Sequence, residues 1–316
     1  MSERSAFVSK GNSTLTATPC LNHCVINLNK PKGITSHQAV ETVRRRSGIR
    51  KAGHAGTLDP LATGVLLVCT GEATKITRFL SDLDKEYVVV VKLGEKTDTY
   101  DAEGTVIQRT ESFSLGKEDI EKILPGFTGT IEQLPPMYSA VKMGGKPLYK
   151  LARKGVTVER EKRVVTVHEI RITRFSLPLL EMRVSCSKGT YIRSLCHDMG
   201  EVLGVGAHVT ELERTRIGGF SVADALTLDE VEGLIGGQGK NLAPGLSGID
   251  AALGHLKDLS LSENDFRRVR HGLTVHCPDG LFLPDQYLRL KDPSGKLFAI
   301  GEITQGVIKT ERMLHL

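Results

Sequence analysis

The chain has 316 residues, of which 40% are hydrophobic and 25% are charged, and its formal net charge is +5. This balance is typical of a folded soluble protein, and the length suits two domains at roughly 150 residues each. The longest apolar runs, residues 65–69 and 88–91, fall far short of the ~18 residues that a membrane helix needs. We therefore expect no membrane partner, while the mild positive charge permits a polyanionic partner such as nucleic acid.

The N-terminus and the cysteines indicate the compartment. Residues 1–19 are polar and lack the apolar stretch of a secretory signal, so they are predicted to form a disordered tail. The six cysteines are scattered along the chain, which is typical of reduced thiols in a cytoplasmic protein.

Cys20, His23 and Cys24 lie close together, but they lack the spacing of a zinc site and no second pair follows. The sequence therefore predicts no metal site.

The first part of the chain combines short strands with a well-marked helix. A strand is expected over residues 24–28, followed by a Pro/Gly turn and a helix that begins after Thr35 and ends at Gly48. Thr35 and Gln38 have the spacing of a capping box, in which each side chain hydrogen-bonds the backbone of the other residue. A Gly-rich loop, residues 52–64, leads from this helix to the apolar sequence VLLVC, which predicts a second strand.

The middle of the chain continues with strands and helices that do not alternate regularly. An apolar strand is expected at residues 86–93. A further strand, residues 163–174, is predicted to bury the side chains on one of its faces: Val165, Val167, Ile170 and Ile172. A helix after residue 190 is expected to bury residues at helical spacing: Ile192, Leu195, Met199 and Val202. This order favours an α+β fold over a doubly wound sheet.

A change of pattern divides the chain. Residues 233–247 are rich in glycine and weak in pattern, so they are the expected linker. Beyond them, short strands are predicted within residues 274–277, 286–291, 296–303 and 306–314. We therefore expect a larger domain over residues 20–247 and a small, mostly β domain over residues 248–316.

The strongest chemical signal lies in residues 53–64. Pro60 disfavours the helical conformation for Asp59 and holds it extended, so this loop presents a single carboxylate. Tight bends and close approach of a ligand to the backbone are allowed by its glycines: Gly53, Gly56 and Gly64. Taken alone, the Leu-Asp-Pro sequence is an ordinary turn.

The complete sequence GHAGTLDPLATG of this loop resembles the signature of TruB-type pseudouridine synthases, GHxGTLDPxAxGVL. Other motifs similar to those of this family occur in order at residues 30–36, 71–75, 84–87, 94–101, 134–142, 186–193 and 206–214. The resemblance covers residues 25–228 and implies a pseudouridine synthase fold, with a central mixed or antiparallel sheet flanked by helices. Over residues 248–316 it is looser and implies a small PUA-like RNA-binding β-barrel.

The resemblance implies a catalytic role for Asp59. Pseudouridine formation breaks the C1′–N1 bond of uridine and rejoins the base through C5, which requires a nucleophile but no cofactor or metal. Asp59 could attack C6 of uracil, attack C1′ of the ribose, or support an elimination. Arg193 is expected to pair with Asp59 and to lower its pKa by ~1–3 units. Without the motif, Arg193 would be interpreted as a solvated arginine in the first turn of a helix.

The resemblance also implies a set of substrate-binding residues, because the target uridine must be extruded from its loop before it can react. Tyr87 is expected to stack on the base, His54 to enter the RNA loop, Tyr191 to contact RNA, and Leu212 to form the floor of the pocket. The plainer alternatives are a core tyrosine, a loop histidine bonded to backbone, and a core leucine. Lys75 is either an active-site contact or a helix-surface lysine.

A basic segment precedes the strand at residue 163. Between residues 142 and 163 only two acidic residues accompany eight basic ones: Lys142, Lys146, Lys150, Arg153, Lys154, Arg160, Lys162 and Arg163. Such a run is usually a solvated face. The resemblance instead implies a thumb-like RNA-binding insertion over residues 134–163, whose affinity for phosphates should be sensitive to salt.

These features predict an enzyme that isomerises uridine to pseudouridine at position 55 in the T loop of tRNA. The expected partner is the T arm of tRNA, and we expect a monomer. One alternative is a guide-RNA-dependent relative within the same reaction class. The other is a tRNA-folding chaperone without catalysis, which the combination of Asp59, Tyr87 and Arg193 disfavours.

Overall fold

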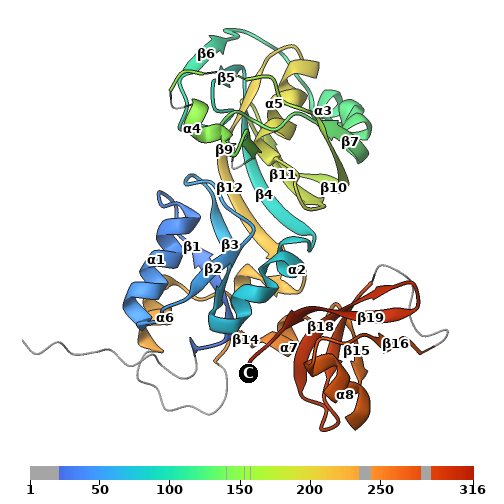
Figure 1. The fold of residues 1–316 in the computed structure, drawn as a ribbon. Helices are drawn as coiled ribbons and strands as arrows, with labels where there is room; N and C mark the ends of the chain where they lie inside the picture. The colour runs from blue at the N-terminus through green and yellow to red at the C-terminus, as the bar shows by residue number, and fades with distance from the viewer. Residues whose placement is uncertain (1–20, 140, 153, 157, 235–242, 279–285) are drawn as a thin grey trace, which may run out of the picture.

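The computed structural model describes residues 21–139, 141–152, 154–156, 158–234, 243–278 and 286–316. The predicted tail, Cys20 and Arg153 lie outside these residues, as does most of the expected linker. Figure 1 shows a large upper and central body built around one long sheet, with the C-terminal sheet beside its lower end.

A ten-stranded mixed sheet forms the centre of the described structure. Its main strands neighbour one another in the order β14 (Leu246–Gly248), β1 (Cys24–Lys30), β3 (Thr63–Thr70), β12 (Ala207–Ile217), β4 (Lys85–Leu93), β11 (Leu179–Cys186), β10 (Arg163–Ser176) and β7 (Gly129–Gln133). Two short strands lie beside this path: β2 (Ala52–Ala55) on β3 and β13 (Phe220–Ser221) on β12. The sheet confirms the predicted α+β architecture.

The two halves of this sheet meet where β3 and β12 run parallel, while the other strand pairs of the sheet are antiparallel. Gly64 is paired with Arg214 at this junction and has a φ of 95°. A Cβ atom at Gly64 would lie 2.3 Å from the carbonyl oxygen of Arg214. Only glycine permits the two backbones to approach this closely, and the junction brings the Asp59 loop against β12.

Helices flank the sheet: α1 (Ser36–Ser47), α2 (Thr77–Ser81), α3 (Lys117–Ile123), α5 (Ile192–Val202) and α6 (Leu228–Gly233). Short 3₁₀ helices add η2 (Gly71–Ile76), η3 (Leu124–Phe127) and η4 (Val222–Asp224). The predicted capping box is confirmed, since Thr35 and Gln38 satisfy each other's backbone and Gly48 ends α1 in the left-handed conformation.

Smaller elements occupy the upper part of the molecule in Figure 1. One two-stranded sheet pairs β5 (Glu95–Thr97) with β6 (Val106–Arg109), and another pairs β8 (Lys142–Met143) with β9 (Lys146–Pro147). A short helix, α4 (Leu148–Ala152), follows β9. The basic segment therefore contains a hairpin and a helical turn.

The C-terminal part is a separate five-stranded sheet in the order β15 (Lys257–Ser260), β17 (Tyr287–Lys291), β18 (Leu297–Thr304), β19 (Val307–Met313) and β16 (Val275–His276). The sheet curls beside two helices, α7 (Ile249–Ala252) and α8 (Glu263–Arg270). The four predicted strands are confirmed. Strand β15 and helix α8 were not predicted.

The C-terminal sheet shares apolar core with the large sheet. Val25 and Leu67, on β1 and β3, belong to the same buried cluster as Leu297, Ile300 and Leu314. Strand β14 lies in the expected linker, yet it pairs with β1. The two parts of the chain are thus tied together by packing as well as by their covalent connection.

Three local features differ in detail from the sequence predictions. Val202 is 63% exposed, because it is the last residue of α5 and the chain turns away after it. Residues 52–55 of the Gly-rich loop form β2, since their backbone pairs with β3. The predicted buried face of β10 requires a register shift between Val167 and Glu169, which lets Ile170 and Ile172 pack against the core.

Candidate active site

The Asp59 loop is held at both ends by buried side chains. Ser36 Oγ accepts a hydrogen bond from Leu58 N at 2.8 Å and donates one to Leu58 O at 3.0 Å. Arg214, which is 1% exposed, donates from Nη2 to Gly56 O at 2.7 Å and from Nε to Val65 O at 2.8 Å. These hydrogen bonds anchor the loop to the protein on both sides of Asp59.

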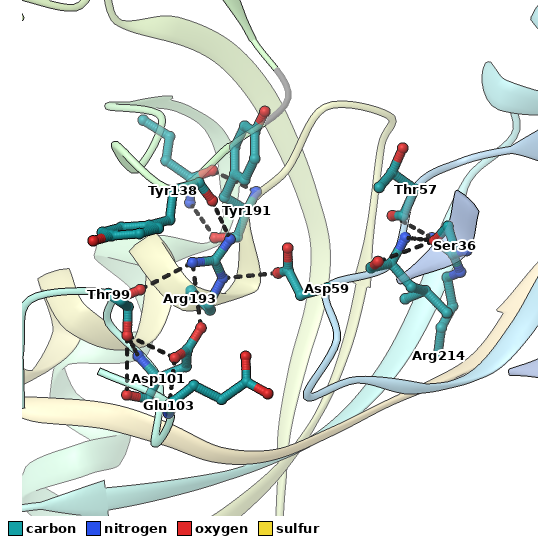
Figure 2. Close-up of polar contacts among 12 residues, drawn as sticks. Ser36, Thr57, Asp59, Thr99, Asp101, Glu103, Tyr138, Tyr191, Arg193 and Arg214 are labelled. Atoms are coloured by element: carbon teal, nitrogen blue, oxygen red, sulfur yellow. Dashed lines mark hydrogen bonds and ion pairs between the residues drawn. The ribbon is translucent and has the colours of Figure 1, made fainter. Parts of the chain in front are cut away.

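Arg193 is the centre of the polar cluster drawn in Figure 2. Its Nε lies 2.8 Å from Asp59 Oδ2, and its Nη1 lies 3.3 Å from Asp101 Oδ2. Nη1 also donates to Thr99 O at 2.9 Å, and Nη2 donates to Tyr138 O at 2.7 Å. The arginine side chain is 4% exposed and that of Asp59 is 35% exposed, so a buried guanidinium holds a carboxylate that remains accessible.

Two opposing effects act on the pKa of Asp59. Burial raises the pKa of Asp59 and outweighs the charge of Arg193, which lowers it, while Asp101 adds to the rise. The pairing of Arg193 with Asp59 and its lowering effect on this pKa agree with the prediction, which did not include the burial that makes the net shift upward. Burial also raises the pKa of Glu103, and it lowers the pKa of Lys30 to about 8.

Asp59 opens into a cavity of about 240 Å³ between the loop, β4, β12 and the start of α5. Its walls include Tyr87, Tyr191, Arg193 and Leu212, which the sequence predicted as substrate-binding residues. Burial raises the pKa of Tyr87, which is 7% exposed. The cavity combines one accessible carboxylate with two tyrosines and a leucine, a surface suited to a flat, partly apolar ring.

Comparisons with known proteins identify the family of this chain. A model described as TruB family pseudouridylate synthase (N terminal domain) matches residues 44–192, and one described as tRNA pseudouridylate synthase B C-terminal domain matches residues 193–253. The tRNA pseudouridine synthase B of Pseudomonas aeruginosa (strain UCBPP-PA14) is 45% identical over 293 residues, which cover 92% of this chain and 95% of that protein. The chain belongs to the TruB family of pseudouridine synthases.

Other relatives extend this match. The tRNA pseudouridine synthase B of Pseudomonas putida (strain GB-1) is 45% identical over 295 residues, covering 92% of this chain and 95% of that protein. A chain in the crystal structure of a Cbf5-Nop10-Gar1 complex has a TM-score of 0.73 at 26% identity, covering 96% of this chain and 91% of that chain. A chain in the structure of an H/ACA RNP bound to a substrate RNA has a TM-score of 0.72 at 24% identity, covering 97% and 92%, and shares the fold.

Two residues singled out in the sequence lie away from the cavity of this TruB-family protein. His54 is on β2 and does not line the cavity. Its Nδ1 is buried without a hydrogen-bond partner among the described residues, and burial lowers its pKa. Lys75 pairs with Glu72 at 2.6 Å and donates to Met313 O at 2.8 Å, so it ties η2 to the C-terminal sheet. Neither predicted role for Lys75 describes this contact.

Several residues of the site were not assigned a role from the sequence. Asp101 and Arg214 lie inside the family-like motifs, but no local pattern distinguishes them from solvated charges. Asp101 accepts a 2.6 Å hydrogen bond from Thr99 Oγ1 and one from Glu103 N at 3.1 Å, which orients it toward Arg193. The need for Asp101 could have been inferred from the burial of Arg193. A buried arginine needs more partners than a single, partly exposed carboxylate.

The chemistry available at the site follows from this cluster. Across the described residues, no group of three or more histidine, cysteine or acidic side chains is arranged to hold a metal ion. Within the same residues, no helix is long and apolar enough to cross a membrane. Among the side chains that line the cavity, the carboxylate of Asp59 is paired with a buried guanidinium and can act as a nucleophile or accept a proton.

Proposed function

We propose that the protein isomerises the uridine at position 55 in the T loop of tRNA, with Asp59 as the nucleophile. The observation that carries this proposal is the accessible carboxylate of Asp59, held 2.8 Å from Arg193 at the wall of a cavity of nucleoside size. Relatives at 45% identity are named tRNA pseudouridine synthase B, which supports tRNA as the substrate.

The isomerisation moves the base without changing its composition. The C1′–N1 bond breaks, a C1′–C5 bond forms, C5 loses a proton and N1 gains one. Asp59 assists the detachment of the base, and Arg193 stabilises its ionised form against burial. Tyr87 and Leu212 bound the space in which the free uracil turns. We assign no metal or redox cofactor to this reaction, since it is neither a hydrolysis nor an oxidation.

The substrate uridine has to leave the stack of its RNA loop, which costs a few kcal/mol that contacts to the flipped nucleotide offset. Tyr191 lines the cavity and is proposed to contact RNA, while His54, on β2 at the start of the signature loop, is proposed to enter the RNA as the base leaves. We further propose that residues 134–163 grip the T arm and that residues 248–316 form an RNA-binding unit.

The test is direct. Purified protein is incubated with unmodified tRNA transcript, and pseudouridine is mapped by carbodiimide-dependent primer-extension stops. We expect one new stop, in the T loop, without any added guide RNA. A stop only after a guide RNA is supplied would favour the guide-dependent alternative, and tRNA refolding without any stop would favour a chaperone.

A further inference from the structure

The residue that ends β7 is bonded to the start of α5. Gln133 is 2% exposed, and its side-chain amide faces the backbone of Tyr191 with both of its polar atoms. Nε2 donates to Tyr191 O at 2.9 Å, and Oε1 accepts from Tyr191 N at 2.7 Å. The buried amide of Gln133 therefore bonds both the N–H and the carbonyl of Tyr191, which lies 58 residues away in the sequence.

Neighbouring contacts strengthen the same connection. Ser194 Oγ donates to Leu134 O at 3.0 Å, and Arg193 Nη2 donates to Tyr138 O at 2.7 Å. The chain between β7 and the basic segment is thus attached to the first turn of α5 by side chains from both partners. Gln133 is the member of this connection that comes from the sheet.

The attachment point determines where α5 begins. Tyr191 is the N-cap residue of α5 and has no side-chain capping hydrogen bond. Its carbonyl accepts the first helical bond from Leu195 N at 3.0 Å in addition to the bond from Gln133. Helix N-termini leave backbone donors without helical partners, and here Gln133 satisfies the one at Tyr191. The orientation of the first turn, which carries Arg193, therefore depends on Gln133.

We infer that Gln133 is a positioning residue for the isomerisation, which holds Tyr191 and, through the first turn of α5, Arg193 in the geometry that Asp59 requires. This inference rests on the proposed function. Gln133 does not line the cavity, so it acts through its neighbours. A displacement of order 1 Å at a reacting group can lower a rate by about 100-fold. A shift of the first turn of α5 would produce such a displacement between Arg193 and Asp59.

A purely structural role for Gln133 makes a different prediction, and the chain contains a matched control. Asn27 is also 2% exposed, its amide donates to Ser221 O at 2.8 Å, and it does not line the Asp59 cavity. Gln133→Leu and Asn27→Leu both replace a buried amide by an apolar side chain of similar size. If burial alone matters, both substitutions change stability and neither changes catalysis.

The experiment uses the full chain and measures the single-turnover rate at saturating enzyme, tRNA affinity by filter binding, and thermal stability. We expect Gln133→Leu to lower the single-turnover rate about 10- to 100-fold with little change in affinity, and Asn27→Leu to leave the rate unchanged. Loosening Arg193 should also move the acid limb of the rate profile to higher pH, because Arg193 opposes the effect of burial on Asp59. A folded Gln133→Leu variant with the rate and acid limb of Asn27→Leu would overturn the inference.

If Gln133→Leu does not fold, Gln133→Glu decides the question. An ionised glutamate still accepts from Tyr191 N but cannot donate to Tyr191 O, whereas the protonated acid can do both, as the amide does. The rate of Gln133→Glu, divided by that of the wild-type protein at the same pH, should therefore rise as the pH falls. A ratio independent of pH contradicts the inference. A wild-type protein without pseudouridine formation would instead reject the proposed function itself.

Discussion

The Asp59 site and the neighbouring basic segment are built in opposite ways. The side chain of Arg193 is 4% exposed and contacts two carboxylates and two backbone carbonyls. In the basic segment Lys150 and Lys154 are exposed, and Met143 and Val156 are 40% and 46% exposed. The comparison indicates that the reaction needs one fixed geometry, whereas contact with phosphates needs charge that can adapt to the RNA.

The contrast extends to how each region contributes free energy. Interactions that strengthen only in the transition state raise the rate of the chemical step, while uniform binding of substrate lowers KM alone. We expect the buried cluster to control the rate and the exposed lysines to control affinity. Substitutions in each region should therefore separate the two quantities.

The largest effect is expected for Asp59→Asn. Loss of the nucleophile should lower the single-turnover rate by at least about 10³-fold and leave tRNA affinity nearly unchanged. The variant should be at least as stable as the wild-type protein at neutral pH, since burial raises the pKa of Asp59 and so disfavours its ionised form in the fold. Tritium release from C5-labelled uridine, filter binding and thermal melting measure these three quantities. Substantial residual turnover would move the chemistry to another residue.

The next effect concerns the shape of the cation beside Asp59. Arg193→Lys keeps the charge but cannot reproduce contacts to Asp59, Asp101 and two carbonyls, so we expect a rate loss of about 100-fold. Arg183→Lys is the control, because Arg183 pairs with Glu86 on the surface at 2.7 Å and its side chain is 45% exposed. Equal rates for the two variants would mean that charge alone is sufficient at position 193.

A moderate effect is expected on the pH dependence of the rate. In the proposed mechanism Asp59 reacts as a carboxylate, so activity should fall as the pH drops through its pKa. Because burial raises this pKa, the acid limb should lie above the ordinary value of ~3.9 for aspartate. Single-turnover rates between about pH 4.5 and 8, with tRNA binding followed in parallel, test the sign. A rate that stays constant down to about pH 4.5 would show that the ion pair with Arg193 prevails over burial.

The smallest effect on the chemical step is expected in the basic segment. Replacing Lys150 and Lys154 by alanine should weaken tRNA binding and reduce the slope of log affinity against log salt by roughly 0.7–0.9 for each phosphate that the variant no longer neutralises. The rate at saturation should not change. The control replaces two exposed lysines of α3, Lys117 and Lys122. If the two double variants have the same salt dependence, residues 134–163 are a solvated face.

Local sequence determined the parts of this protein whose physical cause lies within a few residues. The beginning and end of α1 follow from Thr35, Gln38 and Gly48, since capping and the left-handed turn involve only neighbouring backbone groups. The prediction that Pro60 keeps Asp59 out of the helical conformation has the same local origin. These signals, together with the motifs around them, were sufficient to predict the fold class and five of the residues that line the cavity: Asp59, Tyr87, Tyr191, Arg193 and Leu212.

Only the tertiary structure decided which distant groups meet. Asp101 and Gln133 contact α5 from positions 92 and 58 residues away from their partners Arg193 and Tyr191, and no short pattern encodes such a pairing. The direction in which the pKa of Asp59 shifts depends on how far the fold buries the carboxylate away from water. A predicted ion pair does not specify that burial. The sequence thus determined the carboxylate and its loop, and the packing of remote segments determined its electrostatics and its support.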